Sequence, residues 1–292
     1  MNVNIDMKKL TKIVFGILLA SLLLSVAFWF IQINSLDRKG PKIKMDKKTL
    51  TVGIKADDED FLKGVTAMDD KDGDVTDTLV VEKVSNFLED GKRKVTYAAV
   101  DKSTNVTRAT RIVKYKNYKS PRFNLKKPLV FASTSSNNLD IMENIQVKDK
   151  IDGNISNQIK LLSDETVDLY DSGDYKVNFR VTNSAGDTIT LPATIEVYDS
   201  DKKNERPFIY LDQYIIYVKK GQKVNPSSHV EAVSVGSGYE MDPDDVVSDI
   251  STGSVSYDDS DVNYEKRGTY EIKYRVKADS KVGTVRLIVV VY

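Results

Sequence analysis

Acidic residues gathered around a glycine are the part of this sequence whose types and spacing point most directly to chemistry. One such stretch, Asp69-Asp70-Lys71-Asp72-Gly73-Asp74, is followed 80 residues later by Asp149-Lys150-Ile151-Asp152-Gly153-Asn154. Carboxylate and amide oxygens are the ligands that calcium takes in sets of about six to eight. The same residue types also form tight turns, because glycine adopts positive φ and Asp or Asn bonds to nearby backbone groups. The sequence leaves both interpretations open.

Groups that catalyse reactions near neutral pH are scarce. His229 is the single histidine, it follows Pro226-Ser227-Ser228 without a companion motif, and cysteine is absent. An exposed loop histidine fits this context better than a general base. No Gly-x-Ser-x-Gly elbow or phosphate-cradling glycine loop is present, and no carboxylate pair stands in a setting typical of glycoside hydrolysis. We therefore expect a protein without catalytic or cofactor-binding residues, that is, not an enzyme.

Tyrosine is the other residue type suited to contact with a ligand, and the chain contains 15 of them. Two of these, Tyr210 and Tyr214, fall on one face of a strand expected over residues 210–218, and Ile216 continues that face. An exposed row of aromatic rings binds sugar or protein, whereas a strand also favours tyrosine for packing alone. The candidate partner-binding residues are Tyr210, Tyr214, Tyr239 and Tyr257.

The elements that must position these residues are short strands in a repeating order. From residue 42 onward the apolar residues alternate with polar ones and are separated by Gly, Asn, Asp and Ser, which predicts strands rather than helices. A glycine followed by a strand with three inward positions occurs three times, which indicates three repeats. These inward positions are Val95, Tyr97 and Ala99; Val177, Phe179 and Val181; and Ile272, Tyr274 and Val276. The third repeat is longer, and we expect the insertion in a loop over residues 234–261.

The first repeat resembles the bacterial Ig-like domain found in tandem on Gram-positive surface proteins and also in a pesticidal crystal toxin. The resemblance lies in Ala67-x-Asp69-x-x-Asp72-Gly73-Asp74-Val75-Thr76, then Gly91, then Val95-x-Tyr97-x-Ala99-x-Asp101 and Asn105. The second repeat is similar at Asp149, Asp152, Gly153, Gly173, Tyr175, Val177, Phe179, Asn183 and Gly186. The third keeps Gly268, Tyr270, Ile272 and Tyr274 and lacks the acidic turn. The resemblance implies seven-stranded sandwiches used as spacer or adhesive modules.

In an Ig-type sandwich the B–C and F–G loops share one end. The resemblance therefore implies that the acidic turn approaches Asp101 and Asn105 in the first repeat, and Asn183 and Asp187 in the second. This end faces the preceding segment of the chain, where a bound calcium ion would stiffen a linker. The expected calcium ligands are Asp69, Asp72, Asp74, Asp101, Asp149 and Asp152, and calcium is the one cofactor considered.

A single apolar stretch, Ile13 to Ile33, precedes the repeats and is long enough to cross a membrane as a helix. The predicted fold class is all-β, with three tandem Ig-like β-sandwich domains after one N-terminal transmembrane helix. The predicted segments are a cytoplasmic tail at 1–12, the transmembrane helix at 13–33, a linker at 34–41, Ig-like domain 1 at 42–116, domain 2 at 121–198 and domain 3 at 207–292. Protease cuts are expected near residues 117–121 and 199–207, where few core contacts should cross.

The alternative for the apolar stretch is a signal peptide cleaved before Phe28, since lysines precede the stretch and Ser25 and Ala27 have small-x-small spacing. We favour an uncleaved anchor because the apolar run continues through that position. Basic residues flank both sides of the span, so charge alone does not orient it. Because of the family resemblance, we expect the N-terminus in the cytoplasm and the C-terminal domains outside the cell.

Composition narrows the range of partners. With 43 basic and 43 acidic residues the net charge is zero, which removes the usual reason to expect nucleic acid. We expect a structural spacer or an adhesion module on the bacterial cell surface that contacts an extracellular protein or a cell-wall polysaccharide, with the third, membrane-distal domain as the contact. The alternative is an accessory or sensor subunit that pairs with a membrane protein through its span, where Gly16 and Ala20 form a small-xxx-small pattern.

Overall fold

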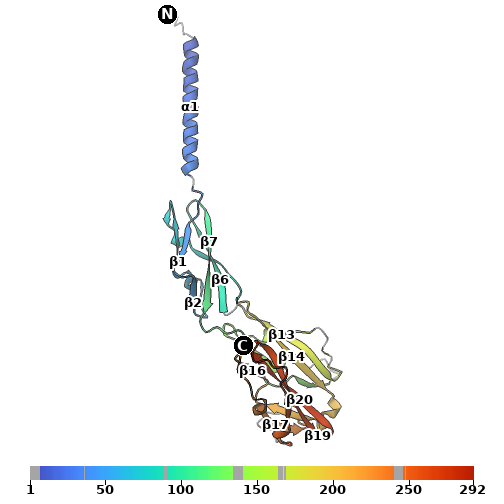
Figure 1. The fold of residues 1–292 in the computed structure, drawn as a ribbon. Helices are drawn as coiled ribbons and strands as arrows, with labels where there is room; N and C mark the ends of the chain where they lie inside the picture. The colour runs from blue at the N-terminus through green and yellow to red at the C-terminus, as the bar shows by residue number, and fades with distance from the viewer. Residues whose placement is uncertain are drawn as a thin grey trace. The chain divides into compact units, whose positions relative to one another are not determined.

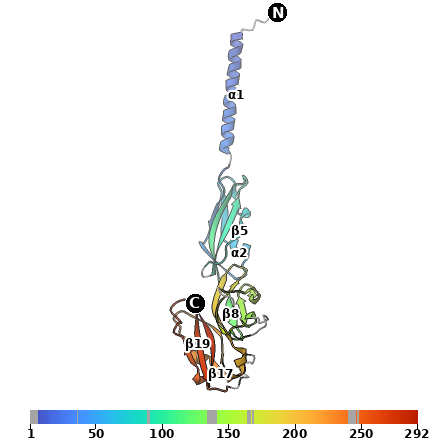
Figure 2. The same ribbon diagram turned by 90° about the vertical axis from the view of Figure 1, so that its right-hand side faces the viewer.

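A computed structural model of the chain describes residues 7–35, 37–88, 91–133, 141–163, 167, 169–239, 246 and 248–292. The chain folds into two compact units, Met1–Lys116 and Asn117–Tyr292, which we call the N-terminal and the C-terminal unit. Figures 1 and 2 show one long helix at the start of the chain and strands throughout the rest. The first repeat lies in the N-terminal unit, and the second and third repeats lie together in the C-terminal unit.

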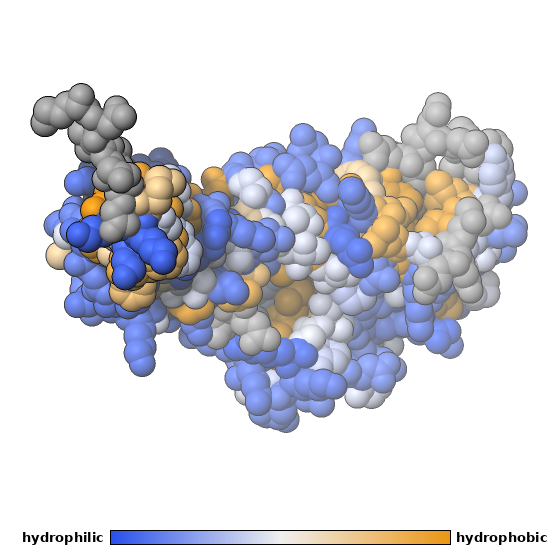
Figure 3. Space-filling model, turned by 90° about the horizontal axis from the view of Figure 1, so that it is seen from above, coloured by the Kyte–Doolittle hydropathy of each residue, from blue (hydrophilic) through white to orange (hydrophobic). Residues whose placement is uncertain are grey.

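Helix α1 spans Met7–Ser35 and contains the apolar stretch expected at 13–33. Its apolar side chains are exposed on every face; Phe15 is 67% and Trp29 is 63% accessible. Figure 3 looks onto the N-terminal end of the chain and shows hydrophobic surface around this helix, whereas hydrophilic side chains cover most of the visible β-rich surface. Among the described residues, α1 is the one helix long and apolar enough to cross a membrane, a test that a signal sequence also passes.

The first repeat forms two facing sheets, as the alternating pattern predicts. One sheet has the strand order β1-β3-β4 and the other has the order β2-β7-β6-β5, with β2 parallel to β7. The bounds are β1 Lys42–Met45, β2 Thr49–Val52, β3 Val65–Asp69, β4 Gly73–Asp74, β5 Val80–Val84, β6 Lys92–Val100 and β7 Val106–Tyr115. A short helix α2, Asp58–Leu62, and a 3₁₀ turn η1, Thr76–Thr78, join these strands.

The second repeat has the same strand order, with sheets β11-β10-β8 and β12-β13-β14-β9, and again one parallel pair, β9 with β14. Its strands are β8 Arg122–Leu125, β9 Val130–Ala132, β10 Ile145–Asp149, β11 Gly153–Asn154, β12 Lys160–Leu162, β13 Gly173–Thr182 and β14 Thr188–Tyr198. Two 3₁₀ turns, η3 Ile141–Asn144 and η4 Ser156–Gln158, complete it.

The third repeat keeps the sheet pair, and its described residues contain no counterpart of the small hairpin strands β4 and β11. Its sheets are β15-β17 and β16-β20-β19-β18, with β16 parallel to β20. The strands are β15 Pro207–Leu211, β16 Ile215–Val218, β17 Val230–Val235, β18 Ser256–Asp258, β19 Gly268–Ala278 and β20 Lys281–Val291. The 3₁₀ turns in its described residues include η5 Ser200–Glu205, η6 Pro226–His229 and η8 Thr252–Ser254. Residues 240–245 and 247 of the expected loop at 234–261 lie outside the described residues.

The nine inward positions expected from the repeat pattern are all in the core, none more than 2% exposed. These residues lie in the middle of β6, β13 and β19, which are central strands of the larger sheets. In the C-terminal unit the core residues of the second and third repeats belong to one hydrophobic cluster, with Leu191 and Ile195 of β14 and Leu287 and Val289 of β20 among its members. The two sandwiches of this unit therefore share buried contacts in addition to their own cores.

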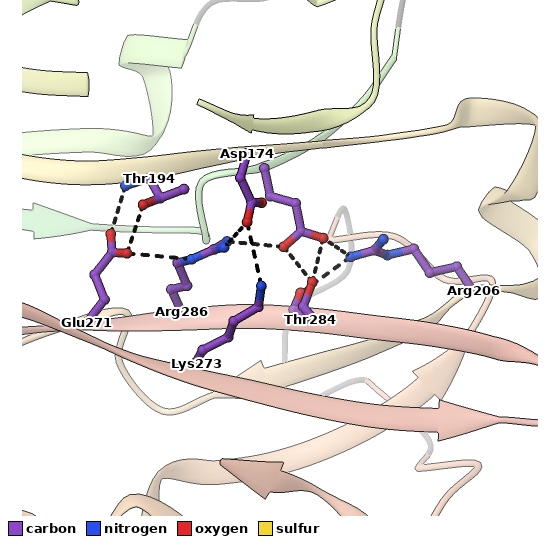
Figure 4. A network of polar contacts seen from close by, with 8 residues as sticks. Asp174, Thr194, Arg206, Glu271, Lys273, Thr284 and Arg286 are labelled. Carbon is purple, nitrogen blue, oxygen red and sulfur yellow. Dashed lines mark hydrogen bonds and ion pairs between the residues drawn. The ribbon is translucent and has the colours of Figure 1, made fainter. Parts of the chain in front are cut away.

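A polar network also joins the second and third repeats (Figure 4). Glu196 on β14 accepts hydrogen bonds from Arg206 at 2.5 Å, from the Thr284 hydroxyl at 2.5 and 2.6 Å, and from Arg286 at 3.3 Å. Arg286 also pairs with Asp174 and lies 3.5 Å from Glu271. Buried charges are tolerated when they are paired and hydrogen-bonded, and here the Glu196 carboxylate is paired across the contact with Arg206 and Arg286.

The start of the third repeat is structured, because Ser200–Glu205 is a 3₁₀ helix capped by Asp199 and Arg206 is anchored on Glu196. The protease cuts expected near residues 199–207 stay a prediction. One expectation in this region is wrong. The strand expected over 210–218 is two strands, β15 and β16, that belong to different sheets. The division into domains at 42–116, 121–198 and 207–292 stays a prediction.

Candidate functional site

The acidic turn of the first repeat is a tight hairpin between β3 and β4. Gly73 has φ +77°, a conformation that a residue with a Cβ rarely adopts. The Asp69 Oδ1 atom accepts hydrogen bonds from the backbone N–H groups of Lys71 at 2.7 Å and Asp72 at 2.9 Å. The N–H of Asp72 and then that of Lys71 hold the pKa of Asp69 below its ordinary value. Asp69 is therefore ionised at neutral pH, and the turn geometry alone explains the motif.

Three carboxylates nevertheless meet beside this turn, and we call Asp37, Asp69 and Asp101 the acidic corner. One carboxylate oxygen from each lies within 4.8 Å of the others. Asp69 and Asp101 are buried, at 8% and 5% exposure. Asp37 comes from the segment between α1 and β1, so the corner joins the end of the helix segment to the first sandwich.

Neutral groups supply the hydrogen bonds that reach the acidic corner. The Asn105 side-chain amide donates to Asp101 Oδ2 at 2.8 Å and to the Asp37 carbonyl at 3.1 Å, and the Asn105 N–H donates to Asp101 Oδ1 at 2.8 Å. The Lys39 N–H donates to Asp37 Oδ1 at 3.1 Å, and the other carboxylate oxygen, Oδ2, is buried without a hydrogen-bond partner. Within the described residues, no lysine or arginine side chain is hydrogen-bonded to these three carboxylates.

Two of the expected calcium ligands in this repeat point elsewhere. Asp72 accepts the N–H of Lys102 at 2.9 Å, and Asp74 accepts the N–H of Thr76 at 2.9 Å. The Thr76 side chain and then its N–H lower the pKa of Asp74, which is typical of a carboxylate that caps a turn. The sequence motif thus contributes one carboxylate, Asp69, to the acidic corner, and the loop after β6 contributes Asp101 as the resemblance implied.

At the matching place in the second repeat, a different set of side chains forms the hydrogen bonds. Tyr118 donates its hydroxyl proton to Asp187 Oδ2 at 2.6 Å and accepts from the Asn183 side chain at 2.9 Å. Asn183 also donates to Asp149 Oδ2 at 3.2 Å. Burial and then the hydrogen bond to Asp187 raise the pKa of Tyr118 well above its ordinary value, so this hydroxyl remains a donor. The acid-rich cluster found in the first repeat has no counterpart in the described part of the second.

Asp152, the last expected ligand, accepts from the N–H of Ser184 at 2.7 Å and from its hydroxyl at 2.6 Å. It therefore ties the acidic turn to the loop after β13, as Asp72 does in the first repeat. Sequence reasoning missed Asp37 and Tyr118, which occupy matching places 81 residues apart. The signal that would have found them is the repeat offset itself, which is 80 for the turn and 82 for the strand that follows.

The tyrosine candidates do not form an exposed row. Tyr210 and Tyr214 are buried, at 1% and 4% exposure, and the Tyr210 hydroxyl is hydrogen-bonded to Ser237 at 2.8 Å. Tyr239 packs its ring against Phe208 and Tyr210, with centroids 5.2 and 5.3 Å apart. Tyr257 on β18 is 44% exposed. The expectation of an exposed row is therefore wrong, because Tyr210 on β15 and Tyr214 just before β16 both belong to the core of the C-terminal unit.

His229 lies at the end of η6, and its Nδ1 atom is 2.7 Å from Asp212 Oδ1. Its side chain is 16% exposed, so it is more enclosed than the loop position predicted from sequence. The pair holds the turn before β17 against the loop after β15. The assignment of the chain as non-enzymatic stays a prediction.

Comparison with known proteins adds little to this geometry. No family model matches the chain. An uncharacterized 81.3 kDa protein of Acholeplasma phage L2 is 28% identical over 156 residues, which are 52% of this chain and 19% of that protein. The chain therefore spans about a fifth of the length of this relative.

Solved structures of β-rich proteins also match over long stretches. The CBM51-2 and INT domains of Clostridium perfringens ZmpB match at 19% identity and a TM-score of 0.21, over 49% of this chain and 30% of that one. Drosophila N-cadherin EC1-4 matches at 14% identity and a TM-score of 0.24, over 88% of this chain and 76% of that one. These TM-scores carry no argument about function, so the function has to be argued from the chain's own residues.

Proposed function

We propose that this protein is a membrane-anchored, non-catalytic surface protein whose β-sandwiches act outside the cell as a spacer or binding module. The observation that carries the proposal is the combination of α1, whose apolar side chains are exposed on all faces, with an all-β remainder that has polar outer surfaces. An exposed apolar helix is unfavourable in water and favourable in lipid, where about 20 apolar residues cross the hydrocarbon core.

The anchor is tested by expressing the full chain in a bacterium and separating membranes from the soluble fraction. We expect the protein in the membrane after a carbonate wash, with an intact N-terminus by mass spectrometry. A Leu22→Arg/Leu23→Arg variant should leave the membrane fraction, because each central arginine costs about 2.5–3.5 kcal/mol of insertion. Protease added to intact cells should digest the sandwiches. A mature protein that begins at Phe28, or sandwiches protected until lysis, would overturn the proposal.

We further propose that the acidic corner holds one divalent cation, with calcium as the ion whose ligand preferences fit best. Calcium binds oxygen at about 2.3–2.6 Å, so two of its ligand atoms lie at most about 5 Å apart. One carboxylate oxygen each of Asp37, Asp69 and Asp101 lies within 4.8 Å of the other two, which is inside this limit. The buried Asp37 oxygen without a hydrogen-bond partner supplies the second reason, because such an atom is costly unless a cation satisfies it.

The second repeat provides a matched control within the chain. It places a tyrosine hydroxyl and an amide where the first repeat has Asp37 and Asp101, and its hydrogen bonds are satisfied by neutral donors. Asp37→Tyr/Asp101→Asn/Asn105→Asp copies this arrangement into the first repeat. We expect this variant to fold and to lose the cation. Because Asp37 follows α1, the cation would fix the segment that leaves the membrane.

Calcium binding is tested on the full chain in detergent micelles by calorimetric titration and by thermal unfolding with and without calcium. A bound ion stabilises the folded state by mass action, by about 2.7 kcal/mol at a hundredfold excess over its Kd. We expect this gain in the unaltered protein and in Asp70→Asn, whose exposed carboxylate pairs with Lys42 at 2.8 Å outside the corner. Asp37→Asn should remove it. An equal gain in Asp37→Asn, or no gain in the unaltered protein, would refute the site.

A further inference from the structure

A broad groove in the C-terminal unit lies between the second and third repeats, at the end of β8 and beside β16. Its volume is about 820 Å³. Its charged lining residues are Lys119, Arg122, Lys148, Lys150 and Asp149, and Tyr217 forms part of one wall. A pocket of this size accepts a ligand of several sugar or polyol units.

Arg122 is held in this groove by two aromatic rings. Its guanidinium carbon lies 4.5 Å from the ring centroid of Tyr217 and 5.0 Å from that of Tyr292. The Tyr217 hydroxyl in turn accepts from the Phe123 N–H at 2.8 Å and lies 3.2 Å from the Phe123 carbonyl. Burial raises the pKa of Tyr217 to about 12, so the ring keeps its proton and its place. A stacked guanidinium is planar and pre-oriented, which suits the paired oxygens of an anionic group.

Positive charge in the groove is not neutralised by ion pairs within the described part of the chain. Within the described residues, no carboxylate is ion-paired with Lys119, Arg122, Lys148 or Lys150, and the three lysines are exposed. Asp149 is the one acidic residue of the lining, and it is buried with its oxygens turned to the N–H groups of Ile151 and Asp152 and to Asn183. The groove therefore has four positively charged side chains and one carboxylate, whose oxygens are already hydrogen-bonded, although the net charge of the whole chain is zero. Such a local excess attracts anions.

We propose that this groove binds an anionic extracellular chain, either an acidic polysaccharide or a polyol phosphate, through its carboxylate or phosphate groups. Arg122 receives one anionic group through its paired N–H donors, and the lysines on either side contact the next groups as mobile point charges. The aromatic faces are occupied by Arg122, so recognition depends on charge rather than on stacking of sugar rings. The choice of an extracellular chain as the ligand class rests on the proposed binding role outside the cell. The groove itself depends neither on the membrane anchor nor on the proposed cation.

The test uses the purified full chain in detergent micelles and fluorescence anisotropy at low and moderate salt. The probes are a labelled polygalacturonate hexamer, a labelled glycerol-phosphate hexamer, a neutral N-acetylglucosamine hexamer and a single-stranded DNA hexamer. We expect one of the two acidic chains to bind, more weakly as salt rises, and the neutral hexamer not to bind. The probe that binds shows whether the anionic groups are the carboxylates of a polysaccharide or the phosphates of a polyol phosphate. Binding of the DNA hexamer as tight as that of the acidic chains would overturn the assignment to a glycan or polyol.

Matched variants separate the groove from general charge. Lys148→Ser/Lys150→Ser should weaken binding about tenfold or more, because two charge-assisted contacts to the anionic chain are lost. Lys160→Ser/Lys277→Ser removes the same charge from exposed lysines that do not line the groove and should leave affinity unchanged. Arg122→Lys keeps the positive charge but removes the paired N–H donors of the guanidinium, so this variant should also bind the acidic chain less tightly. If both lysine pairs have equal effects, or if neither acidic chain binds, the proposal is wrong; membrane fractionation reports separately on the anchor.

Discussion

Removal of the Glu196 carboxylate is the sharpest test of how the C-terminal unit is held together. Its side chain is 9% exposed, and those of Arg206 and Arg286 are 11% and 10% exposed, so the charges are buried where the two sandwiches meet. In Glu196→Ala, Arg206 loses its carboxylate and keeps a 3.4 Å hydrogen bond to the Thr284 carbonyl and its place over the Tyr198 ring, neither of which supplies a negative charge. Arg286 retains Asp174 and Glu271.

The expected magnitude follows from the cost of an uncompensated buried charge. Removing one partner of a buried pair costs about 3–5 kcal/mol. For a unit of this size each kcal/mol lowers the melting temperature by about 2–4 °C, which gives a loss of about 6–20 °C. Asp174→Ala is the matched control, because Asp174 contacts the same Arg286 but is 45% exposed. It should cost less than about 1 kcal/mol.

The assay is thermal and urea unfolding of the full chain in detergent micelles, followed by near-ultraviolet circular dichroism. The transition of the C-terminal unit should move in Glu196→Ala, and that of the N-terminal unit should not. Equal losses in Glu196→Ala and Asp174→Ala would refute the reasoning that burial sets the cost. A combined Glu196→Leu/Arg206→Met/Arg286→Met variant should recover much of the loss, since well-packed apolar residues often replace buried ion pairs without penalty.

Three further predictions concern stability. Arg111 is buried and donates hydrogen bonds to the carbonyls of Phe61 and Lys63 and to the Tyr97 hydroxyl at 3.1 Å, whereas the second repeat has Ala193 and Phe179 in the places of Arg111 and Tyr97. Arg111→Ala should therefore lower the free energy of unfolding in urea by about 3 kcal/mol or more, and adding Tyr97→Phe should lower it little further. Additive losses in the double variant would contradict the coupling of the two side chains. A Cβ on Gly283 would lie 1.9 Å from the Pro207 carbonyl oxygen, so Gly283→Ala should destabilise the C-terminal unit by about 1–3 kcal/mol in thermal unfolding. A Cβ on Gly253 would lie 3.6 Å from the Ser251 hydroxyl oxygen, an ordinary contact, so Gly253→Ala should not be destabilising, and equal losses in the two variants would contradict the reasoning. Thr76 lowers the pKa of Asp74, so the contribution of Asp74 to stability is present above its unfolded-state pKa near 3.8 and is lost as pH falls through its folded-state pKa. Asp74→Asn, which copies Asn154 of the second repeat, should therefore reduce the loss of stability between pH 5 and pH 2. An unchanged slope of stability against pH would contradict this prediction.

Strand positions were the part of the fold that the sequence predicted best. Alternation places Val95, Tyr97 and Ala99 on one face, and the structure buries all three. A period of two residues is a local property of an extended chain, so it can be recognised without knowing what the strand packs against. Repetition of the same pattern in three places indicated three repeats, whereas the sandwich class was implied by the family resemblance.

The candidate sites depended on which segments fold back onto one another. The turn motif predicted Asp69 and the loop after β6 predicted Asp101, but Asp37 joins them from the segment after α1. Asp72 and Asp74 are close to Asp69 in sequence yet bond to the backbone of Lys102 and Thr76 instead. A carboxylate in a turn can face a cation or a backbone N–H, and residue type does not distinguish these two outcomes.

The sequence by itself determined the apolar helix, the strand periodicity, the three repeats and the glycine turns, because these follow from the local chemistry of neighbouring residues. Only the tertiary structure decided that Tyr210 and Tyr214 are buried, that Glu196 joins two repeats, and that the Arg122 guanidinium lies over the rings of Tyr217 and Tyr292. Each of these depends on contacts between residues far apart in the chain. Such contacts are set by how the sheets pack, and a strand carries no local signal of which neighbour will cover its face.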